Sequence, residues 1–279
     1  MFHPILASRA SRLGVGCTPA CSVYAMKSPL KAPPLRNPGE SGQQRLQALF
    51  DDQVMPYLIA AALFTMVAFM DWVRWLNNSP PSPILFSTTA VLAIAICAVK
   101  LHAGIREAKA IKLGRDGEKV VGQFLERLRE QGAQVFHDIP GDRFNLDHVV
   151  IHPSGIYVIE TKTLSKPDHG ECRLVYDGQS VRRNGKAFDR NAINQVCAAS
   201  RWLRVLLIES TGKTPPIRPV VAYPGWFIER TAEAKASAVW VLEPKALPEF
   251  IAQSAIQMKS EDVRLFAFHL SRYIRGAQK

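Results

Sequence analysis

The sequence NLDHVVIHPSGIYVIETKT, residues 145–163, contains the clearest local signal for the structure of this chain. Two apolar segments, 146–151 and 156–163, are joined by the tetrapeptide HPSG at 152–155. Proline at the second position of that tetrapeptide and glycine at the fourth suit a type I turn. The stretch therefore predicts two strands joined as an antiparallel hairpin.

The length of the turn determines which residues face each other. If His152 and Gly155 pair, carrying the pairing outwards one residue at a time places Asp147 opposite Glu160. Lys162 is two residues beyond Glu160, so strand alternation puts its side chain on the same face. A turn of three residues would instead put the two acids on opposite faces.

Two carboxylates and one ammonium group are thus expected on one face of the hairpin. Like charges directly opposite each other across a strand pair are destabilising, and a divalent cation would compensate them. Mg²⁺, or Mn²⁺, prefers such oxygen ligands, which makes Asp147 and Glu160 the expected metal ligands. With Lys162 orienting or activating water, the pattern is typical of metal-assisted phosphodiester hydrolysis. The alternative is an ordinary surface hairpin on which Glu160 and Lys162 form an ion pair.

The rest of the chain after residue 100 alternates helical and strand-like segments. A helix is expected over 103–130, where apolar residues recur at helical spacing before a break at Gly132. Further strands are expected at 134–139, 172–176, 180–183, 219–223 and 238–242, and further helices at 192–210, 245–252 and 262–275. The pattern predicts a mixed α/β domain.

Two uncharged apolar runs precede this domain, at 54–70 and 84–99. Each is near the short end of the length that spans a bilayer, and each is apolar all round the helix. Trp72 and Trp75, in the short connecting loop, fit an interfacial aromatic belt. We expect a transmembrane hairpin; the alternative is a buried helical hairpin in a soluble core.

The distribution of basic residues predicts the orientation of this hairpin. Six of the seven bases before residue 100 precede the first run, five bases lie in 100–115, and the connecting loop has only Arg74. Because cytoplasmic flanks carry the excess of Lys and Arg, both termini are expected in the cytosol, with the hairpin in the inner (cytoplasmic) membrane. The expected organisation is a disordered basic arm at 1–45, the hairpin at 46–102 and a cytosolic domain at 103–279.

Composition limits the classes of protein to which the chain can belong. With 279 residues, 47% of them hydrophobic, it is not a disordered tail, and a mean hydropathy of −0.02 is too low for a polytopic transporter. Residues 100–279 hold 28 bases against 20 acids, which suits an acidic partner such as a nucleic acid or an anionic membrane surface. The five scattered cysteines predict no disulfide framework and favour a reducing compartment.

Several motifs together resemble the NERD (nuclease-related) domain over about residues 110–230. They are GRDGEK at 114–119, NLDHVVI at 145–151, PSGIYVIETKT at 153–163, NQV at 194–196 and PGWF at 224–227. The family is similar to the PD-(D/E)xK endonucleases, which implies a restriction-endonuclease-like fold with a mixed central sheet flanked by helices. It also implies divalent-metal cleavage of DNA. One departure is Leu146, which stands where the superfamily motif has proline.

The resemblance also implies roles for five residues. Asp147 and Glu160 correspond to the metal carboxylates and Lys162 to the catalytic lysine. Glu118 corresponds to a helical acid that completes the metal site, and Gln195 to a helical polar residue that contacts substrate or the water around the metal. As alternatives, Glu118 is an exposed acid favoured by the helix dipole, and Gln195 is a satisfied amide beneath the sheet.

The function expected from these observations is that of a membrane-anchored, nuclease-like protein that hydrolyses DNA phosphodiester bonds with Mg²⁺. Two alternatives remain open. One is a nucleic-acid-binding module with the same fold and little catalysis. The other is a membrane scaffold whose basic face binds anionic lipid headgroups.

Overall fold

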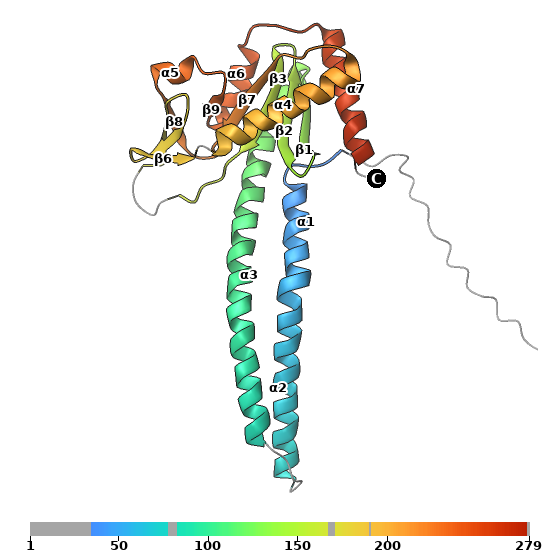
Figure 1. Ribbon diagram of the computed structural model, residues 1–279, viewed down its shortest axis with the longest axis vertical. Coiled ribbons are helices and arrows are strands. Elements are labelled where there is room, and N and C mark those ends of the chain that lie inside the picture. Colours follow the sequence, from blue (N-terminus) through green and yellow to red (C-terminus); the bar gives the residue numbers. More distant parts are fainter. Residues whose placement is uncertain (1–34, 78–82, 167–170, 190, 278–279) are drawn as a thin grey trace, which may run out of the picture. The chain divides into compact units, whose positions relative to one another are not determined.

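The computed structural model describes residues 35–77, 83–166, 171–189 and 191–277. The expected basic arm therefore lies outside the described residues up to residue 34. The elements that follow build a mixed α/β domain with two sheets flanked by helices, preceded by two long apolar helices (Figure 1).

The larger sheet is mixed, with the strand order β1-β2-β3-β7-β9. Its first three strands are antiparallel, and β7 and β9 continue the sheet in parallel from β3. The strands are β1 (Gln134–Pro140), β2 (Asn145–His152), β3 (Gly155–Thr161), β7 (Ile217–Ala222) and β9 (Trp240–Leu242). The sheet is thus the mixed central sheet expected from the sequence.

The β2–β3 hairpin has the register that an even-membered turn requires. His152 pairs with Gly155, and His148 pairs with Ile159. Gly155 has φ 145°, and a Cβ on it would lie 3.3 Å from the carbonyl oxygen of Pro216, so glycine relieves both constraints at the start of β3. The predicted pairing is therefore confirmed.

Helices cover both faces of this sheet, and apolar side chains drive each contact. α4 (Asn191–Thr211) and α7 (Ser260–Ala277) cover one face, where Val149 and Val158 join their buried residues in one core cluster. The C-terminal part of α3 (Pro83–Glu126) and α6 (Leu247–Ala252) cover the other face, around Val150 and Tyr157. Adjacent residues of β2 and β3 thus point into two different cores, as strand alternation requires.

A second sheet, with the order β6-β5-β4-β8, lies beside the α4 face and shares its core. Its strands are β4 (Arg173–Tyr176), β5 (Val181–Arg183), β6 (Lys186–Asp189) and β8 (Phe227–Arg230). The expected strands at 172–176 and 180–183 belong to it. The sequence did not indicate that β8 pairs in parallel with β4, because this contact joins segments far apart in the chain. Short helical segments complete the fold at Arg127–Gln131, Ala232–Lys235 and Pro244–Ala246.

The N-terminal helices are two helical runs, Glu40–Leu76 and Ile84–Gln131, long and apolar enough by length and composition to cross a membrane. The first run joins α1 (Glu40–Leu49) to α2 (Met55–Leu76) through a π-helical turn, Phe50–Val54. The turn sits just before Pro56, whose missing N–H cannot complete the regular ladder.

The apolar side chains of these two runs point outwards. Leu63 is 57% exposed and Leu92 is 64% exposed, and most of their apolar neighbours on α2 and α3 are exposed as well. A core hairpin would bury these side chains, so the alternative of a buried helical pair does not describe them. α3 runs without a break through the expected domain boundary at 102/103, and α1 begins inside the expected arm; the division into domains stays a prediction.

Candidate functional site at the ends of two strands

Asp147 and Glu160 lie at the same end of the hairpin and on the sheet face that α4 covers. Asp147 is two residues before Val149, and Glu160 is two residues after Val158, and both valines belong to the core cluster of that face. Oδ2 of Asp147 accepts the backbone N–H of Thr161 at 2.6 Å, which ties the carboxylate to the end of β3. The Glu160 side chain is buried.

Lys162 brings its ammonium group to the same place. Its Nζ lies 2.9 Å from Oε1 of Glu160 and donates a hydrogen bond to Oε1 of Gln195, also at 2.9 Å. The backbone N–H of Lys162 donates to the carbonyl of Ala222 at 2.9 Å, which continues the β3–β7 ladder beyond Thr161. The direction of the lysine side chain is therefore set by the sheet, and α4 supplies its amide partner.

Glu118 reaches this site from α3, the helix on the opposite face. Its neighbour Gly117 allows a very close approach, because a Cβ there would lie 1.8 Å from Oγ1 of Thr163. The pKa of Glu118 is raised to about 7, first by burial and then by the negative charges of Asp138 and Glu160, while the backbone N–H of Gly39 opposes the shift. Glu118 is thus electrostatically part of the site rather than an exposed helix-terminal acid.

Burial and neighbouring carboxylates act on Asp147 in the same direction. The pKa of Asp147 is raised well above its usual value, first by burial and then by the charges of Glu160 and Glu118. The Thr161 N–H and the Lys162 ammonium offset part of this shift. Three carboxylates therefore repel one another here, and Lys162 contacts one of them. We call the group of Glu118, Asp147, Glu160, Lys162 and Gln195 the strand-end site.

The chemistry of these donors fits a divalent cation, since all three acids offer oxygen ligands and their repulsion would be relieved by positive charge. Their geometry is looser than a closed metal cage. Among the residues that the structure describes, no group of three His, Cys, Asp or Glu side chains is placed to hold a metal ion. The sequence prediction of Asp147, Glu160 and Glu118 as metal ligands therefore stays a prediction.

One buried acid near the site was missed by sequence reasoning. Asp138 on β1 has φ 49°, and its Oδ2 accepts the backbone N–H of Ser41 at 2.7 Å and Nη1 of Arg36 at 3.3 Å. Its Oδ1 accepts Nδ2 of Asn145 at 3.0 Å. Asp138 thus ties the N-terminal turn of α1 to the start of β2, and the only sequence signal was an aspartate within an apolar strand.

His148 follows Asp147 in sequence but lies on the other face, as strand alternation requires. Its Nδ1 is 2.8 Å from Nδ1 of His137, whose Nε2 is 2.9 Å from Oε1 of Glu126. Burial, and then the neighbouring His137, holds the pKa of His148 well below its usual value. The pair is packed beneath α3 and takes no part in the strand-end site.

A cavity of about 550 Å³ opens beside Glu118, between α1, α3 and the loop that joins β1 to β2. Three arginines line it, each from a different one of these segments: Arg45, Arg115 and Arg143. Asn145 also lines it, two residues before Asp147. The strand-end site is therefore flanked by a basic hollow that could receive a phosphate group.

Comparison with known proteins finds a family model that matches part of this chain. Residues 113–224 match the family model described as "Nuclease-related domain", a range that contains all five residues of the strand-end site. An uncharacterized protein of Bacillus anthracis is 30% identical over 80 residues, which are 27% of this chain and 38% of that protein. The chain thus covers less than half of that relative. No solved structure matches the chain.

Proposed function

Because the chain carries a nuclease-related domain at residues 113–224, we propose that it is a membrane-attached nuclease that hydrolyses DNA phosphodiester bonds with a divalent cation. The observation that carries the proposal is the strand-end site. Two features that metal-assisted hydrolysis needs occur together at this site. Burial and mutual repulsion raise the pKa of the carboxyl groups, and an ammonium group lies 2.9 Å from one of them.

Asp147 and Glu160 would hold Mg²⁺ or Mn²⁺, with Glu118 adding negative charge from α3. When bound, the cation supplies Lewis-acid polarisation of the phosphate and a lowered pKa for the attacking water. The Thr161 N–H bonded to Oδ2 of Asp147 leaves the other carboxylate oxygen outside that bond, and keeps the carboxylate from rotating.

Lys162 is the residue that would act on the water and on the developing charge. Its ammonium group is held between Glu160 and Gln195, so it can donate a hydrogen bond to a phosphate oxygen or orient water without first being ordered. Gln195 acts through Lys162 in this scheme, as a positioning residue. The sheet fixes the position of Lys162, and α4 fixes the position of Gln195.

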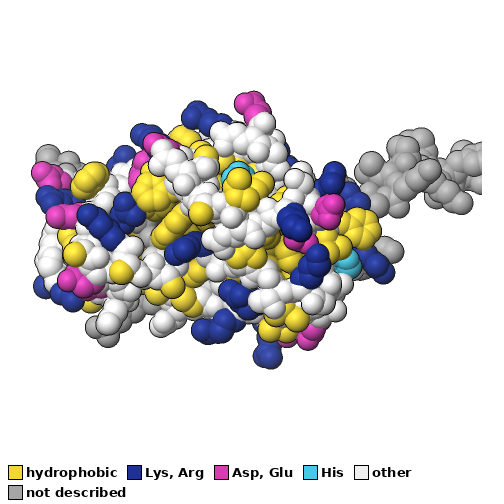
Figure 2. All heavy atoms as spheres, turned by 90° about the horizontal axis from the view of Figure 1, so that it is seen from above, with side chains coloured by type: hydrophobic (Ala, Val, Ile, Leu, Met, Phe, Trp, Pro, Cys, Tyr) yellow, Lys and Arg dark blue, Asp and Glu magenta, His cyan; other side chains and the backbone are white. Residues whose placement is uncertain are grey.

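The basic hollow next to Glu118 would receive the nucleic-acid backbone. Arg45, Arg115 and Arg143 line it, and arginine is well suited to phosphate because its guanidinium presents paired N–H donors. Figure 2 shows Lys and Arg side chains spread over the face seen from above, where Asp and Glu are fewer. The general positive charge would add sequence-independent attraction for a polyanion.

Membrane attachment rests on the two exposed apolar helical runs. Trp72 and Trp75, at the end of α2, would lie at one interface of the bilayer. The excess of bases on the outer flanks of the two runs would keep both termini, and the domain after residue 103, in the cytosol. In this arrangement the nuclease-like domain works on DNA at the inner surface of the membrane.

The proposal is tested with the full-length protein in lipid nanodiscs, incubated with DNA and Mg²⁺ or with EDTA. We expect Asp147→Asn and Lys162→Met each to lower the cleavage rate by about a hundredfold or more, because each removes charge from the strand-end site. Glu209→Gln and Lys259→Met are matched controls on exposed residues away from the site and should cleave like the wild type.

A second candidate function is DNA binding without cleavage. It is favoured by one observation, that the acids of the described segments do not converge into a ready metal-binding group. Salt-dependent DNA binding that Asp147→Asn leaves intact, with no cleavage in Mg²⁺ or Mn²⁺, would support this function and reject the nuclease.

A further inference from the structure

A second hollow, away from the strand-end site, lies at the opposite end of β3. It has a volume of about 480 Å³ and is lined by the turn before β3, the start of β7, α4 and the loop after α6. Gly155 opens β3 there, and at about 3.3 Å per residue it lies about 17 Å along the strand from Glu160. We call it the Arg204–Arg218 cavity.

The charged side chains that line this cavity are all positive. Arg204 and Arg218 both line it, and no Asp or Glu is among the lining residues. Within the described parts of the chain, neither arginine has a carboxylate within ion-pair distance, although both are half-buried. Two half-buried arginines without an acidic partner offer their positive charge to an anionic ligand.

Backbone and ring contacts hold both guanidinium groups in place. Nη1 of Arg204 donates to the carbonyl of Pro215 at 3.0 Å, and Nη1 of Arg218 donates to the carbonyl of Ala238 at 3.3 Å. The Arg218 guanidinium also lies over the Trp240 ring, 5.0 Å from its centroid. Each contact uses only part of the guanidinium fork, which leaves further N–H donors for a ligand.

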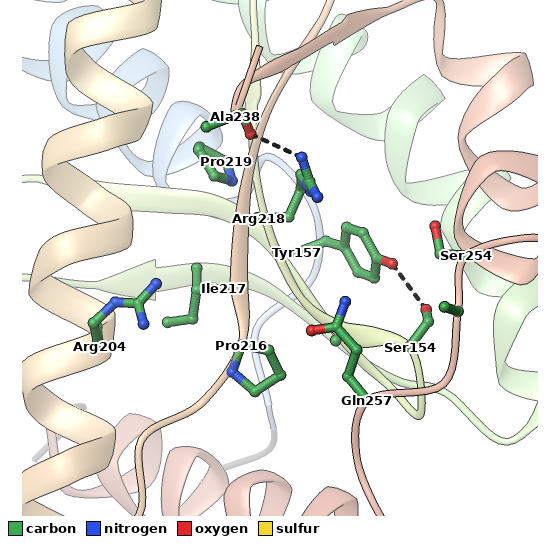
Figure 3. Close-up of a pocket in the computed structure, with 12 residues that line it drawn as sticks. Ser154, Tyr157, Arg204, Pro216, Ile217, Arg218, Pro219, Ala238, Ser254 and Gln257 are labelled. Atoms are coloured by element: carbon green, nitrogen blue, oxygen red, sulfur yellow. Dashed lines mark hydrogen bonds between the residues drawn. The ribbon is translucent and has the colours of Figure 1, made fainter. Parts of the chain in front are cut away.

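The remaining wall is a fixed polar network with apolar surface beside it. Figure 3 shows the Tyr157 hydroxyl directed at Ser154, with Gln257 nearby and the two arginines on either side of the β7 segment. The Tyr157 hydroxyl lies 2.8 Å from Oγ of Ser154, which donates to the carbonyl of Ile251 at 3.0 Å. The cavity is therefore largely preformed.

We propose that the Arg204–Arg218 cavity binds a phosphate monoester of about mononucleotide size. A phosphate monoester carries about −1.5 to −2 charge near neutral pH, which suits a cavity with two arginines and no acid in its lining. The volume lies in the range of small-molecule sites, and Tyr157, Ile217 and the neighbouring prolines offer surface for the organic part. The site does not depend on the proposed cleavage of DNA.

The test measures binding of adenosine monophosphate, inorganic phosphate and adenosine by calorimetry to the full-length protein in phosphatidylcholine nanodiscs. Adenosine monophosphate and phosphate should bind, and adenosine should not. Arg204→Gln and Arg218→Gln should each weaken binding by about ten- to a hundredfold, the effect of losing a charged hydrogen bond. Arg201→Gln, an exposed arginine of the same helix that does not line the cavity, should bind like the wild type.

Thermal unfolding of each variant without ligand shows whether the variant has lost binding or has lost its fold. Arg204→Lys keeps the positive charge and should retain part of the affinity. A further arm adds phosphatidic acid to the nanodiscs. If phosphatidic acid competes with adenosine monophosphate for the cavity, the natural ligand is a lipid headgroup. If phosphatidic acid does not compete, the natural ligand is a soluble phosphate monoester. Failure of both phosphate and adenosine monophosphate to bind, or binding that both glutamine variants leave unchanged, would overturn the proposal.

Discussion

Glu118 is a residue whose ionisation is strongly opposed by burial and by neighbouring negative charge. Its pKa of about 7 comes first from burial and then from Asp138 and Glu160, whose negative charges disfavour a further one. A carboxyl group with this pKa changes its charge near neutral pH. It therefore connects the stability of the domain, and the proposed binding of a cation, to pH.

The sign of the pH effect follows from the direction of the shift. A carboxyl pKa raised by folding favours the protonated folded state, so the stability that it contributes is complete below about pH 4.5 and is lost as pH rises through about 7. We expect Glu118→Gln, which cannot ionise, to raise the melting temperature at about pH 8 and to change it little at about pH 5.

This effect is measured by thermal unfolding in EDTA, so that no cation compensates the charge. Asp116→Asn, a neighbouring acid whose partner is Arg115 at 2.9 Å, is the control and should not reproduce the difference between the two pH values. An equal change in melting temperature at both pH values would contradict the assignment of a raised pKa to Glu118.

At the scale of elements, the close contact between α3 and the end of β3 positions the acid. Gly117→Ala would put a Cβ 1.8 Å from Oγ1 of Thr163, which neither backbone can accommodate without moving apart. We expect a loss of stability of about 1–3 kcal/mol, the usual cost of overpacking, and a fall of the Glu118 pKa toward its ordinary value. Chemical denaturation measures the first effect.

Gly114→Ala is the matched control for this prediction. It lies one helical turn earlier in α3 with nothing within 4 Å of the added Cβ, so alanine should be neutral or stabilising by up to about 1 kcal/mol. The double variant with Thr163→Ala should recover part of the loss. If Gly117→Ala and Gly114→Ala behave alike, packing against Thr163 does not position α3.

The hairpin that carries the site could be predicted because its information is local. The turn at 152–155 fixes the register, and the register alone brings Asp147, Glu160 and Lys162 to one face. The parallel pairing of β4 with β8 could not be predicted, since it joins segments separated by a long stretch of chain.

The same distinction separates the two acids outside the hairpin. Glu118 was predicted only through a resemblance, because its approach to the strands depends on the contact of Gly117 with Thr163. Asp138 was missed because its partners Ser41 and Arg36 precede it by about a hundred residues. A lone acid in a strand does not indicate which distant donors will surround it.

At the scale of the whole molecule, the exposed apolar helices make membrane attachment testable. We expect Leu63→Arg with Leu92→Arg to reduce the membrane-bound fraction, because each arginine near the centre of a span costs about 2.5–3.5 kcal/mol of insertion free energy. Both leucines are more than half exposed, so the domain itself should remain folded. The measurement is the fraction that sediments with membranes after an alkaline wash.

Alanine at the same two positions is the control and should leave the protein in the membrane fraction. A wild-type protein that washes into the soluble fraction would contradict membrane insertion. So would a double-arginine variant retained as fully as the wild type.

The two N-terminal helical runs are both attached to the domain. One is fixed at its domain end by the hydrogen bond of Ser41 to Asp138, the other by the contact of Gly117 with Thr163. Because α3 is continuous, Glu118 stands about 28 Å along the helix from the end of the apolar run at Val99.

A residue inserted into α3 between Val99 and Glu118 would lengthen that helix by about 1.5 Å. It would also turn Glu118 by about 100° relative to the first helical run. The lengths of the two helical runs together therefore set the position of Glu118 relative to both of them.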